Sequence, residues 1–180
     1  MLNLHMGRLV LRPMCAADAS WIARDIANPS VHRWLTSVPF PYRIEDAEQF
    51  IESFAVKEGF RVIVEDDEPL GMISIESARS FDANRSALPE LGYWLAERAW
   101  GRGVMSDAAR AMVDWFFDGQ GDKIGSGWIQ GNTRSPKVLT KLGFLPTGET
   151  LMRHAHFHGK EMPVIRVTLT KDHWQRAKPA

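Results

Sequence analysis

The chain has 180 residues, of which 44% are hydrophobic and 24% are charged, as is ordinary for a globular protein that buries a core. Its 22 basic and 22 acidic residues cancel, so the composition does not favour a polyanionic partner such as nucleic acid. The single cysteine, Cys15, fits a reducing compartment, and neither a signal peptide nor a run of ~20 apolar residues is seen, so we expect one cytoplasmic domain over residues 1–180 with no membrane partner.

The N-terminal part of the sequence predicts one strand and two helices. Arg8–Pro13 alternates in polarity, which is typical of a strand, whereas Asp18–Ala27 has helical spacing. Asn28-Pro29 is expected to stop that first helix, and the Pro-rich segment Thr36–Tyr42 predicts a loop. A second helix ends at Gly59 and carries its apolar residues at Ala47, Phe50, Ile51 and Phe54.

The middle of the sequence predicts a hairpin, a loop, a further strand and a long helix. The expected strands are Phe60–Glu65 and Leu70–Glu76 around a turn at 66–69, and then Glu90–Ala96 after a polar loop over Ser77–Ser86. From Val104 onward the pattern is helical, with Ala108, Met112 and Trp115 on the same face as Val104.

The C-terminal part predicts three strands and one short helix. The strands are Lys123–Gln130, Leu151–Phe157 and Met162–Thr170, and the helix is Ser135–Leu142. Ser135 suits the helix N-cap and Gly143 suits the exit. The whole order of elements indicates a mixed α/β sheet with helices on its faces.

The segment Arg98–Ser106 lies between a predicted strand and a predicted helix. Gly101 and Gly103 let the backbone approach a ligand, and the unpaired amides at a helix start favour an anion such as a pyrophosphate. Arg98 and Arg102 can add positive charge, and Ser106 can add a hydroxyl donor. A tight strand–helix turn with two solvated arginines is the alternative interpretation. The segment fits neither a P-loop nor a dinucleotide-binding fingerprint.

Two motifs together resemble those of the GNAT superfamily, the general N-acetyltransferases. The pattern Arg-x-x-Gly-x-Gly, after Glu90–Leu95, resembles motif A of the branch that includes the ribosomal-protein N-terminal acetyltransferases. Residues Asn132–Ser135, followed by Val138–Phe144, resemble motif B of that branch. One departure is Asp107, where the branch usually has Glu.

The resemblance implies the GNAT fold, a mixed α/β fold with a partly split central sheet and helices on both faces. It also implies acetyl-CoA as cosubstrate, no metal and no covalent enzyme intermediate. The pantetheine arm would pair with the main chain of one strand, and the glycine loop would hold the pyrophosphate. The expected cofactor-binding residues are Tyr93, Trp94, Leu95, Arg98, Gly101, Arg102, Gly103, Val104, Met105, Ser106, Asn132 and Ser135.

Two residues are candidates for catalysis. Glu90 lies at the start of the cofactor strand and is the candidate base, with a solvated strand end as the alternative. Ser135 is the candidate acid for the leaving thiolate, with a helix N-cap as the alternative or coexisting role. Tyr93 is a weaker candidate acid because its side chain can belong to the core. His154, His156 and His158 alternate and predict a polar strand face in preference to a metal site.

The sequence therefore predicts an acetyl-CoA-dependent N-acetyltransferase. A primary amine attacks the thioester directly, and a protein or peptide N-terminus is the favoured acceptor. The alternatives are a small amine or amino acid as acceptor, or a non-catalytic acyl-CoA-binding module on the same fold. The chain is expected to act as a monomer or a homodimer.

Overall fold

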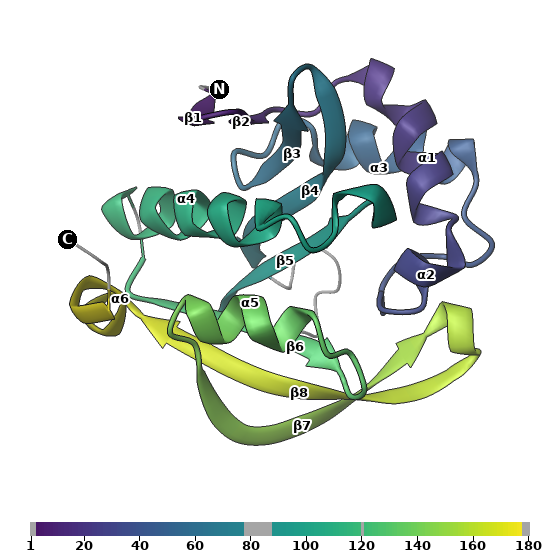
Figure 1. The fold of residues 1–180 in the computed structure, drawn as a ribbon. Helices are drawn as coiled ribbons and strands as arrows, with labels where there is room; N and C mark the ends of the chain where they lie inside the picture. The colour runs from purple at the N-terminus through teal and green to yellow at the C-terminus, as the bar shows by residue number, and fades with distance from the viewer. Residues whose placement is uncertain (1–2, 78–87, 120, 178–180) are drawn as a thin grey trace.

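The computed structural model describes residues 3–77, 88–119 and 121–177, and its eight described strands form one sheet in the order β1-β2-β3-β4-β5-β6-β8-β7 (Figure 1). The strands are β1 Leu4–Met6, β2 Leu9–Arg12, β3 Phe60–Glu65, β4 Glu68–Ser77, β5 Pro89–Leu95, β6 Lys123–Ile129, β7 Leu145–Ala155 and β8 Lys160–Thr170. The helices are α1 Ala19–Ile26, α2 Pro29–His32, α3 Ile44–Phe54, α4 Val104–Gly119, α5 Ser135–Lys141 and α6 Lys171–Ala177. Except for Ser77, the last residue of β4, the predicted loop over Ser77–Ser86 lies outside the described residues.

The sheet is split in its middle. Strands β5 and β6 are parallel and pair only at Glu90 and Gly125, whereas the other neighbouring strands are antiparallel. Just beyond that pair, the Ser126 hydroxyl donates a hydrogen bond to the Leu91 carbonyl at 2.9 Å. From there the two strands diverge, which confirms the predicted partly split sheet.

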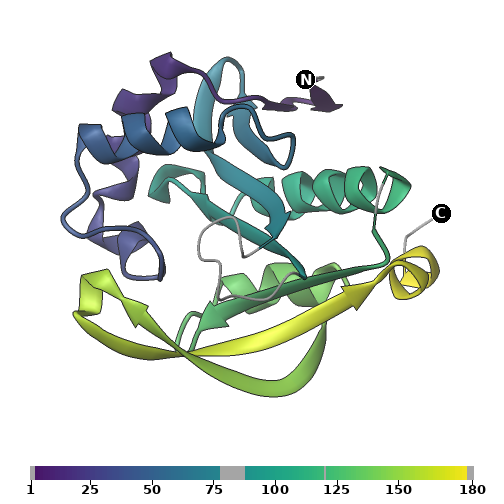
Figure 2. The ribbon, with the colours of Figure 1, turned by 180° about the vertical axis from the view of Figure 1, so that it is seen from behind.

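Helices cover both faces of the N-terminal half of the sheet. On one face, α4 buries Val104, Ala108 and Met112 in the largest apolar cluster among the described residues, as the sequence predicts. On the other face, α1 and α3 pack over β3 and β4, as the view from behind shows (Figure 2). Strand β3 is buried along its whole length because it lies between these two layers.

The predicted hairpin is present and has a two-residue turn. Asp66 and Asp67 have φ values of 49° and 64°, the left-handed conformation that a tight turn between twisted antiparallel strands requires. Strand β4 then pairs with β5 through seven residue pairs, from Gly71–Leu95 to Ser77–Pro89. The hairpin thereby fixes the position of β5, the strand that borders the split.

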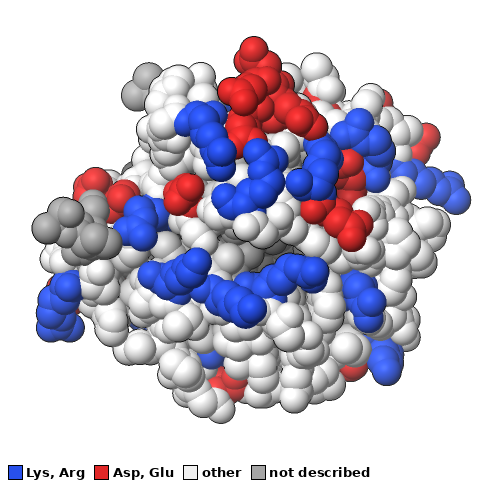
Figure 3. Space-filling view, viewed as in Figure 1, with Lys and Arg blue, Asp and Glu red and all other residues white. Residues whose placement is uncertain are grey.

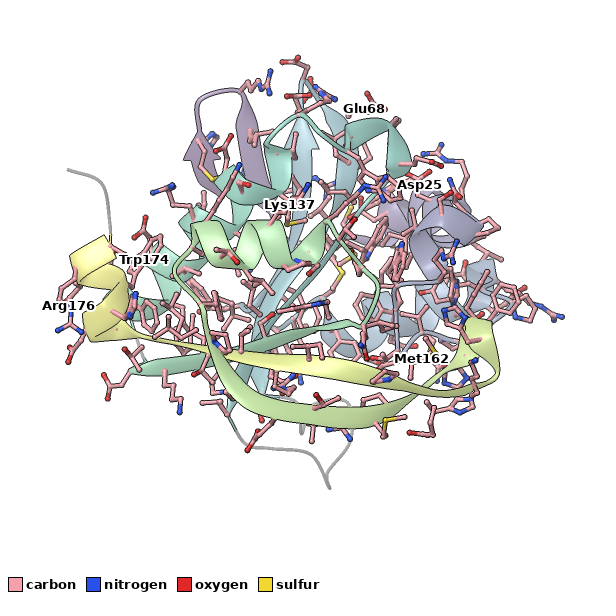
Figure 4. All side chains as sticks on the ribbon, turned by 60° about the horizontal axis from the view of Figure 1, so that its bottom comes forward. Asp25, Glu68, Lys137, Met162, Trp174 and Arg176 are labelled. Carbon is pink, nitrogen blue, oxygen red and sulfur yellow. The ribbon has the colours of Figure 1, made fainter. Side chains whose placement is uncertain are left out.

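Among the described strands and α-helices, three were not predicted from the sequence. Strand β1 has only three residues, too few to show a period. Helix α2 begins where a stop was expected, because the Asn28 side chain accepts a hydrogen bond from the Ser30 amide at 2.9 Å and Pro29 fits a first helical turn. Helix α6 is fixed by buried Trp174, whose indole donates to Asp114 at 2.9 Å (Figure 4). No helix in the described part of the chain is long and apolar enough to span a membrane.

Candidate active site

A cavity of about 450 Å³ occupies the gap where β5 and β6 diverge. Its walls come from β5 on one side, Gly127 and Trp128 of β6 on the other, and the first turns of α4 and α5. The cavity contains ten of the predicted cofactor-binding residues: Tyr93, Trp94, Leu95, Gly101, Gly103, Val104, Met105, Ser106, Asn132 and Ser135. The structure thus brings together two motifs that lie some thirty residues apart in the sequence.

The edge of β5 that faces this cavity is available for main-chain hydrogen bonding. Its opposite edge is fully paired with β4, whereas among the described strands β6 pairs with β5 only at Glu90. Tyr93 and Leu95 point their backbone groups toward the cavity, where the Leu95 carbonyl accepts a hydrogen bond from the Trp100 indole at 3.0 Å, whereas the backbone of Trp94 between them faces β4. A ligand with amide groups can pair with this edge as an added strand does.

The loop after β5 has the geometry of an anion site. A 3₁₀ helix, Glu97–Ala99, is followed by Gly101 and Gly103, whose φ values of 76° and 82° disfavour any L side chain. A Cβ atom on either glycine would have no neighbour within 4 Å, so the loop surface is open on that side. The Ser106 and Asp107 amides both reach back to the Gly103 carbonyl, at 2.9 and 3.2 Å, and the amides before them stand at the start of the helix, where no preceding turn supplies a partner.

The two arginines of this loop bind carboxylates of the protein itself. Arg98 reaches Asp25 at 2.8 Å and Glu68 at 2.7 Å, the two acidic residues labelled in Figure 4. Arg102 pairs with Glu65, which also binds Arg8. Neither arginine is among the described residues that line the cavity. Their contacts fasten the glycine loop to α1 and to the β3–β4 hairpin.

Positive charge along the cavity comes from α5, which sequence reasoning missed. Arg134, Lys137 and Lys141 line the cavity, and Lys and Arg side chains border the hollow on this face of the molecule (Figure 3). The Arg134 guanidinium lies 4.3 Å from the Trp100 ring centroid. The signal was present, since these residues are spaced i, i+3 and i+7 on one helix face.

Ser135 and Tyr93 form the polar centre of the cavity. The Ser135 hydroxyl lies 2.8 Å from the Tyr93 hydroxyl, and the Tyr93 hydroxyl also donates to the Ser135 carbonyl at 3.2 Å. Burial raises the pKa of Tyr93 to about 12, and the hydrogen bond with Ser135 offsets only part of this rise. Tyr93 therefore stays protonated at neutral pH.

The predicted N-cap role of Ser135 is wrong. The Asn132 side chain instead accepts hydrogen bonds from the amides of Arg134 and Ser135, at 3.0 and 3.2 Å. Ser135 is the first residue of α5, and its hydroxyl turns into the cavity toward Tyr93. Asn132, the asparagine of motif B, thus caps the start of α5, and the Ser135 hydroxyl is left to bond Tyr93.

Glu90 lies apart from this centre. It sits at the closed end of the split, where its carboxylate accepts a hydrogen bond from Arg166 of β8 at 2.5 Å, and it is not among the described lining residues. The two side chains are 18% and 12% exposed, so the sequence interpretation of a solvated strand end does not describe Glu90. Its role as a base stays a prediction.

A second cavity, of about 530 Å³, begins where the first one ends. The two cavities share Leu35, Gly92, Tyr93 and Trp94, so they adjoin along residues 92–94 of β5. The second cavity extends under α3 and the loop between α2 and α3. A long ligand in the first cavity and a smaller one in the second would therefore come together at Tyr93.

The three histidines near the end of β7 do not share a strand face. The strand ends at Ala155, and His156–His158 form a 3₁₀ helix. His154 and His156 have ring centroids 5.0 Å apart, while His158 contacts the Arg33 carbonyl. Over the described ranges, no group of three or more His, Cys, Asp or Glu residues is placed to hold a metal ion.

A family model described as an acetyltransferase (GNAT) domain matches residues 8–145. The chain belongs to the GNAT family. Over 181 aligned residues it is 29% identical to the uncharacterized N-acetyltransferase p20 of Bacillus licheniformis, covering 94% of this chain and 96% of that protein. The family match and this relative identify the chain as an N-acetyltransferase, an acyltransferase of the class that uses acetyl-CoA.

Solved structures share the fold. The ribosomal-protein-S5-alanine acetyltransferase from Vibrio fischeri superposes with a TM-score of 0.76 at 20% identity, over 99% of this chain and all of that one. RimJ from Mycobacterium smegmatis, solved in complex with a CoA disulfide, gives 0.72 at 22% identity, over 91% of this chain and 82% of its own. These similarities confirm the predicted GNAT fold.

Proposed function

We propose that the protein transfers the acetyl group of acetyl-CoA to a primary amine, and that the favoured acceptor is the α-amino group of a peptide or protein. The single observation that carries this proposal is the junction of the two cavities at Tyr93. One cavity has an open strand edge, a glycine loop and a basic rim, which suit a long polyanionic thioester. The other has room for the group that carries the amine.

Each part of acetyl-CoA has a counterpart in the first cavity. The pantetheine amides pair with the backbone of β5 at Tyr93 and Leu95, on either side of Trp94. The pyrophosphate lies against the amides of Gly101–Ser106 at the start of α4, with the basic residues of α5 nearby. Asn132 holds the start of α5, so that Ser135 stays beside Tyr93 at the thioester end.

The reaction depends mainly on holding the amine and the thioester in the right positions, and no residue of the protein forms a covalent bond with the acetyl group. The amine nitrogen attacks the thioester carbon, a C–N bond forms, and the C–S bond breaks after a tetrahedral intermediate. Overall, one proton leaves the amine and one reaches the sulfur. The Tyr93 hydroxyl, protonated at neutral pH, turns its one proton from the Ser135 carbonyl to the departing sulfur while it accepts a hydrogen bond from the Ser135 hydroxyl.

The choice of an α-amine follows from proton affinity. An α-amino group has a pKa near ~8, whereas a lysine side chain has one near ~10.4. At neutral pH, on the order of a tenth of α-amines but well under a hundredth of lysines are free to attack. Among the described cavity residues, few can act as a general base that deprotonates the amine. Such an enzyme favours the amine that loses its proton more easily.

A peptide mixture tests the acceptor directly. The enzyme is incubated with acetyl-CoA and peptides that differ in their first residue and carry an internal lysine, and the products are mapped by mass spectrometry. Acetylation of α-amines supports the proposal. Acetyl groups on lysine side chains alone, or transfer only to free small amines, contradict the choice of acceptor, and CoA binding without transfer to any amine indicates a binding module.

A further inference from the structure

The second cavity is the place where the acceptor's substituent must lie if the proposed function is correct. The first cavity is committed to the thioester, and the two meet at Gly92, Tyr93 and Trp94. An amine that attacks the thioester at this junction therefore has to place the rest of its own molecule under α3. The chemistry of that cavity decides which substituents are accepted.

The inner wall of the second cavity is aromatic. Phe50 and Phe54 of α3 and Phe60 of β3 form one cluster, with ring centroids 5.0 to 5.7 Å apart. Met72 of β4 and Trp94 of β5 continue the apolar wall toward the junction with the first cavity. A wall of this kind binds a ring or a branched aliphatic group by removing apolar surface from water.

The charged groups of the cavity are few and opposite in sign. Among the described lining residues, Asp46 supplies the one carboxylate and Arg153 the one guanidinium. The Asp46 carboxylate already accepts a hydrogen bond from the Arg43 amide at 2.7 Å. Burial, followed by the charge of Asp46, raises the pKa of Tyr42 to about 12, so Tyr42 adds a neutral hydroxyl. A polycationic acceptor would bind poorly here, because one carboxylate cannot balance its several positive charges.

We infer that the acceptor carries a bulky apolar group, aromatic or branched aliphatic, within one or two carbons of its amine. This inference rests on the proposed function and adds the class of substituent. Two sources present the same chemistry: a peptide whose first residue is large and apolar, and a free arylalkylamine. A charged substituent at the same place would lose its hydration against the phenylalanine wall.

Matched acceptors test the inference. We would measure thiol release from acetyl-CoA with peptides that differ only in their first residue, which is phenylalanine, leucine, serine, aspartate or lysine. The same assay compares 2-phenylethylamine with ethanolamine. We expect kcat/KM for the apolar acceptors to exceed that of the polar ones by about tenfold or more. The peptide and free-amine arms show which source the enzyme uses.

A substitution that fills the cavity provides the second readout. Ser53 lies on the exposed side of α3 and lines the cavity, so Ser53→Trp narrows it without disturbing the core. We expect this variant to lose about tenfold or more in kcat/KM with the phenylalanine peptide and much less with an alanine peptide. Glu52→Trp, one position earlier, exposed and not a described lining residue, is the matched control and should behave as the parent.

The outcomes distinguish the inference about the acceptor's substituent from the proposed function. Equal kcat/KM across the acceptors, or higher values for the polar ones, overturns the inference and leaves amine acetylation standing. An equal loss for Ser53→Trp with both peptides also overturns it. Absence of acetyl transfer to every amine overturns the proposed function, and the inference with it.

Discussion

The hydroxyl groups of Tyr93 and Ser135 lie 2.8 Å apart, although the residues are separated by 42 positions in the sequence. Tyr93 belongs to the strand that borders both cavities, and Ser135 opens the helix that closes the first cavity. Their contact bridges the two halves of the split sheet near the place where the strands diverge. The contact therefore ties the position of α5 to that of β5, and it places the two hydroxyl groups side by side in the cofactor cavity.

Replacing Tyr93 by phenylalanine removes one hydroxyl and keeps the ring. If this hydroxyl stabilises charge on the departing sulfur, Tyr93→Phe should lower kcat on the order of 100-fold. Binding of CoA, measured by calorimetry, should change little because the backbone of β5 is unaltered. Ser135→Ala should cause a smaller loss, since it leaves the Tyr93 hydroxyl in place. An unchanged kcat in Tyr93→Phe would remove Tyr93 from the reaction.

Replacing Gly103 by valine should block the diphosphate. The new side chain would project into the open side of the loop, at a φ of 82° that disfavours β-branched residues. We expect the Kd for CoA to rise by about tenfold or more, which corresponds to about 1.4 kcal/mol. Gly148→Val is the matched control, because Gly148 has a φ of 78°, equally open surroundings and a place on exposed β7. An equal affinity for CoA in the parent and Gly103→Val would show that the loop does not hold the pyrophosphate.

Glu90→Gln distinguishes a base from a structural ion pair. The geometry predicts a loss of stability of about 1–3 kcal/mol, because the largely buried Arg166 side chain loses its ion pair with the Glu90 carboxylate. Thermal denaturation measures this change, and kcat should fall far less than the about 100-fold typical of a lost general base. A large loss of kcat, deepest at low pH, with an unchanged melting temperature would instead establish the sequence-based role of Glu90.

The basic rim on α5 should contribute to cofactor affinity in a manner that depends on salt. Lys137→Glu places a negative charge beside the cofactor cavity and should raise the Kd for CoA, with a smaller effect as ionic strength increases. Lys123→Glu makes the same change in charge at the other end of β6 and serves as the control. Equal effects of the two substitutions would attribute the result to net charge alone.

His32 should make stability depend on pH. Burial lowers the pKa of His32 below its ordinary value of 6.5, although contacts with the Val38 and Ile26 carbonyls oppose part of this shift. Below about pH 6.5 the unfolded chain takes up a proton that the folded protein resists, so stability falls as pH decreases toward the folded pKa. Melting temperatures between pH 5 and 7.5 should show this fall in the parent and less of it in His32→Gln. Exposed His154→Gln should retain the fall.

Local patterns were sufficient for most of the fold. The alternation in Arg8–Pro13 and the helical spacing after Val104 concern neighbours in sequence and agree with the structure. The turn predicted at 66–69 is present but takes only Asp66 and Asp67, because Glu68 and Pro69 already pair in β4. The motifs also predicted the residues that gather around the first cavity, because strand, glycine loop and helix start are consecutive. The predictions that were wrong concerned short elements or residues that suit two structures. Asn28-Pro29, for example, can end a helix or begin one, and here it begins α2 directly after α1 ends.

Long-range partners could not be read from the sequence. Arg98 and Arg102 appear as free cations beside a predicted anion site, yet their partners Asp25, Glu68 and Glu65 come from earlier, separate elements. Glu90 likewise meets Arg166 only because β8 inserts between β6 and β7. The aromatic wall of the second cavity combines α3 with β3, and spacing alone showed only that Phe50 and Phe54 share a helix face.

The main-chain edge of β5 makes the pantetheine part of the cofactor site tolerant of sequence change. Backbone amides and carbonyls are the same whichever side chains they carry, so a main-chain edge constrains few residue types. The acceptor cavity has no such freedom, because side chains from several elements make its walls. A lineage of such proteins can therefore keep one cosubstrate through extensive divergence and acquire new acceptors by exchanging a few residues on α3 and the loop before it.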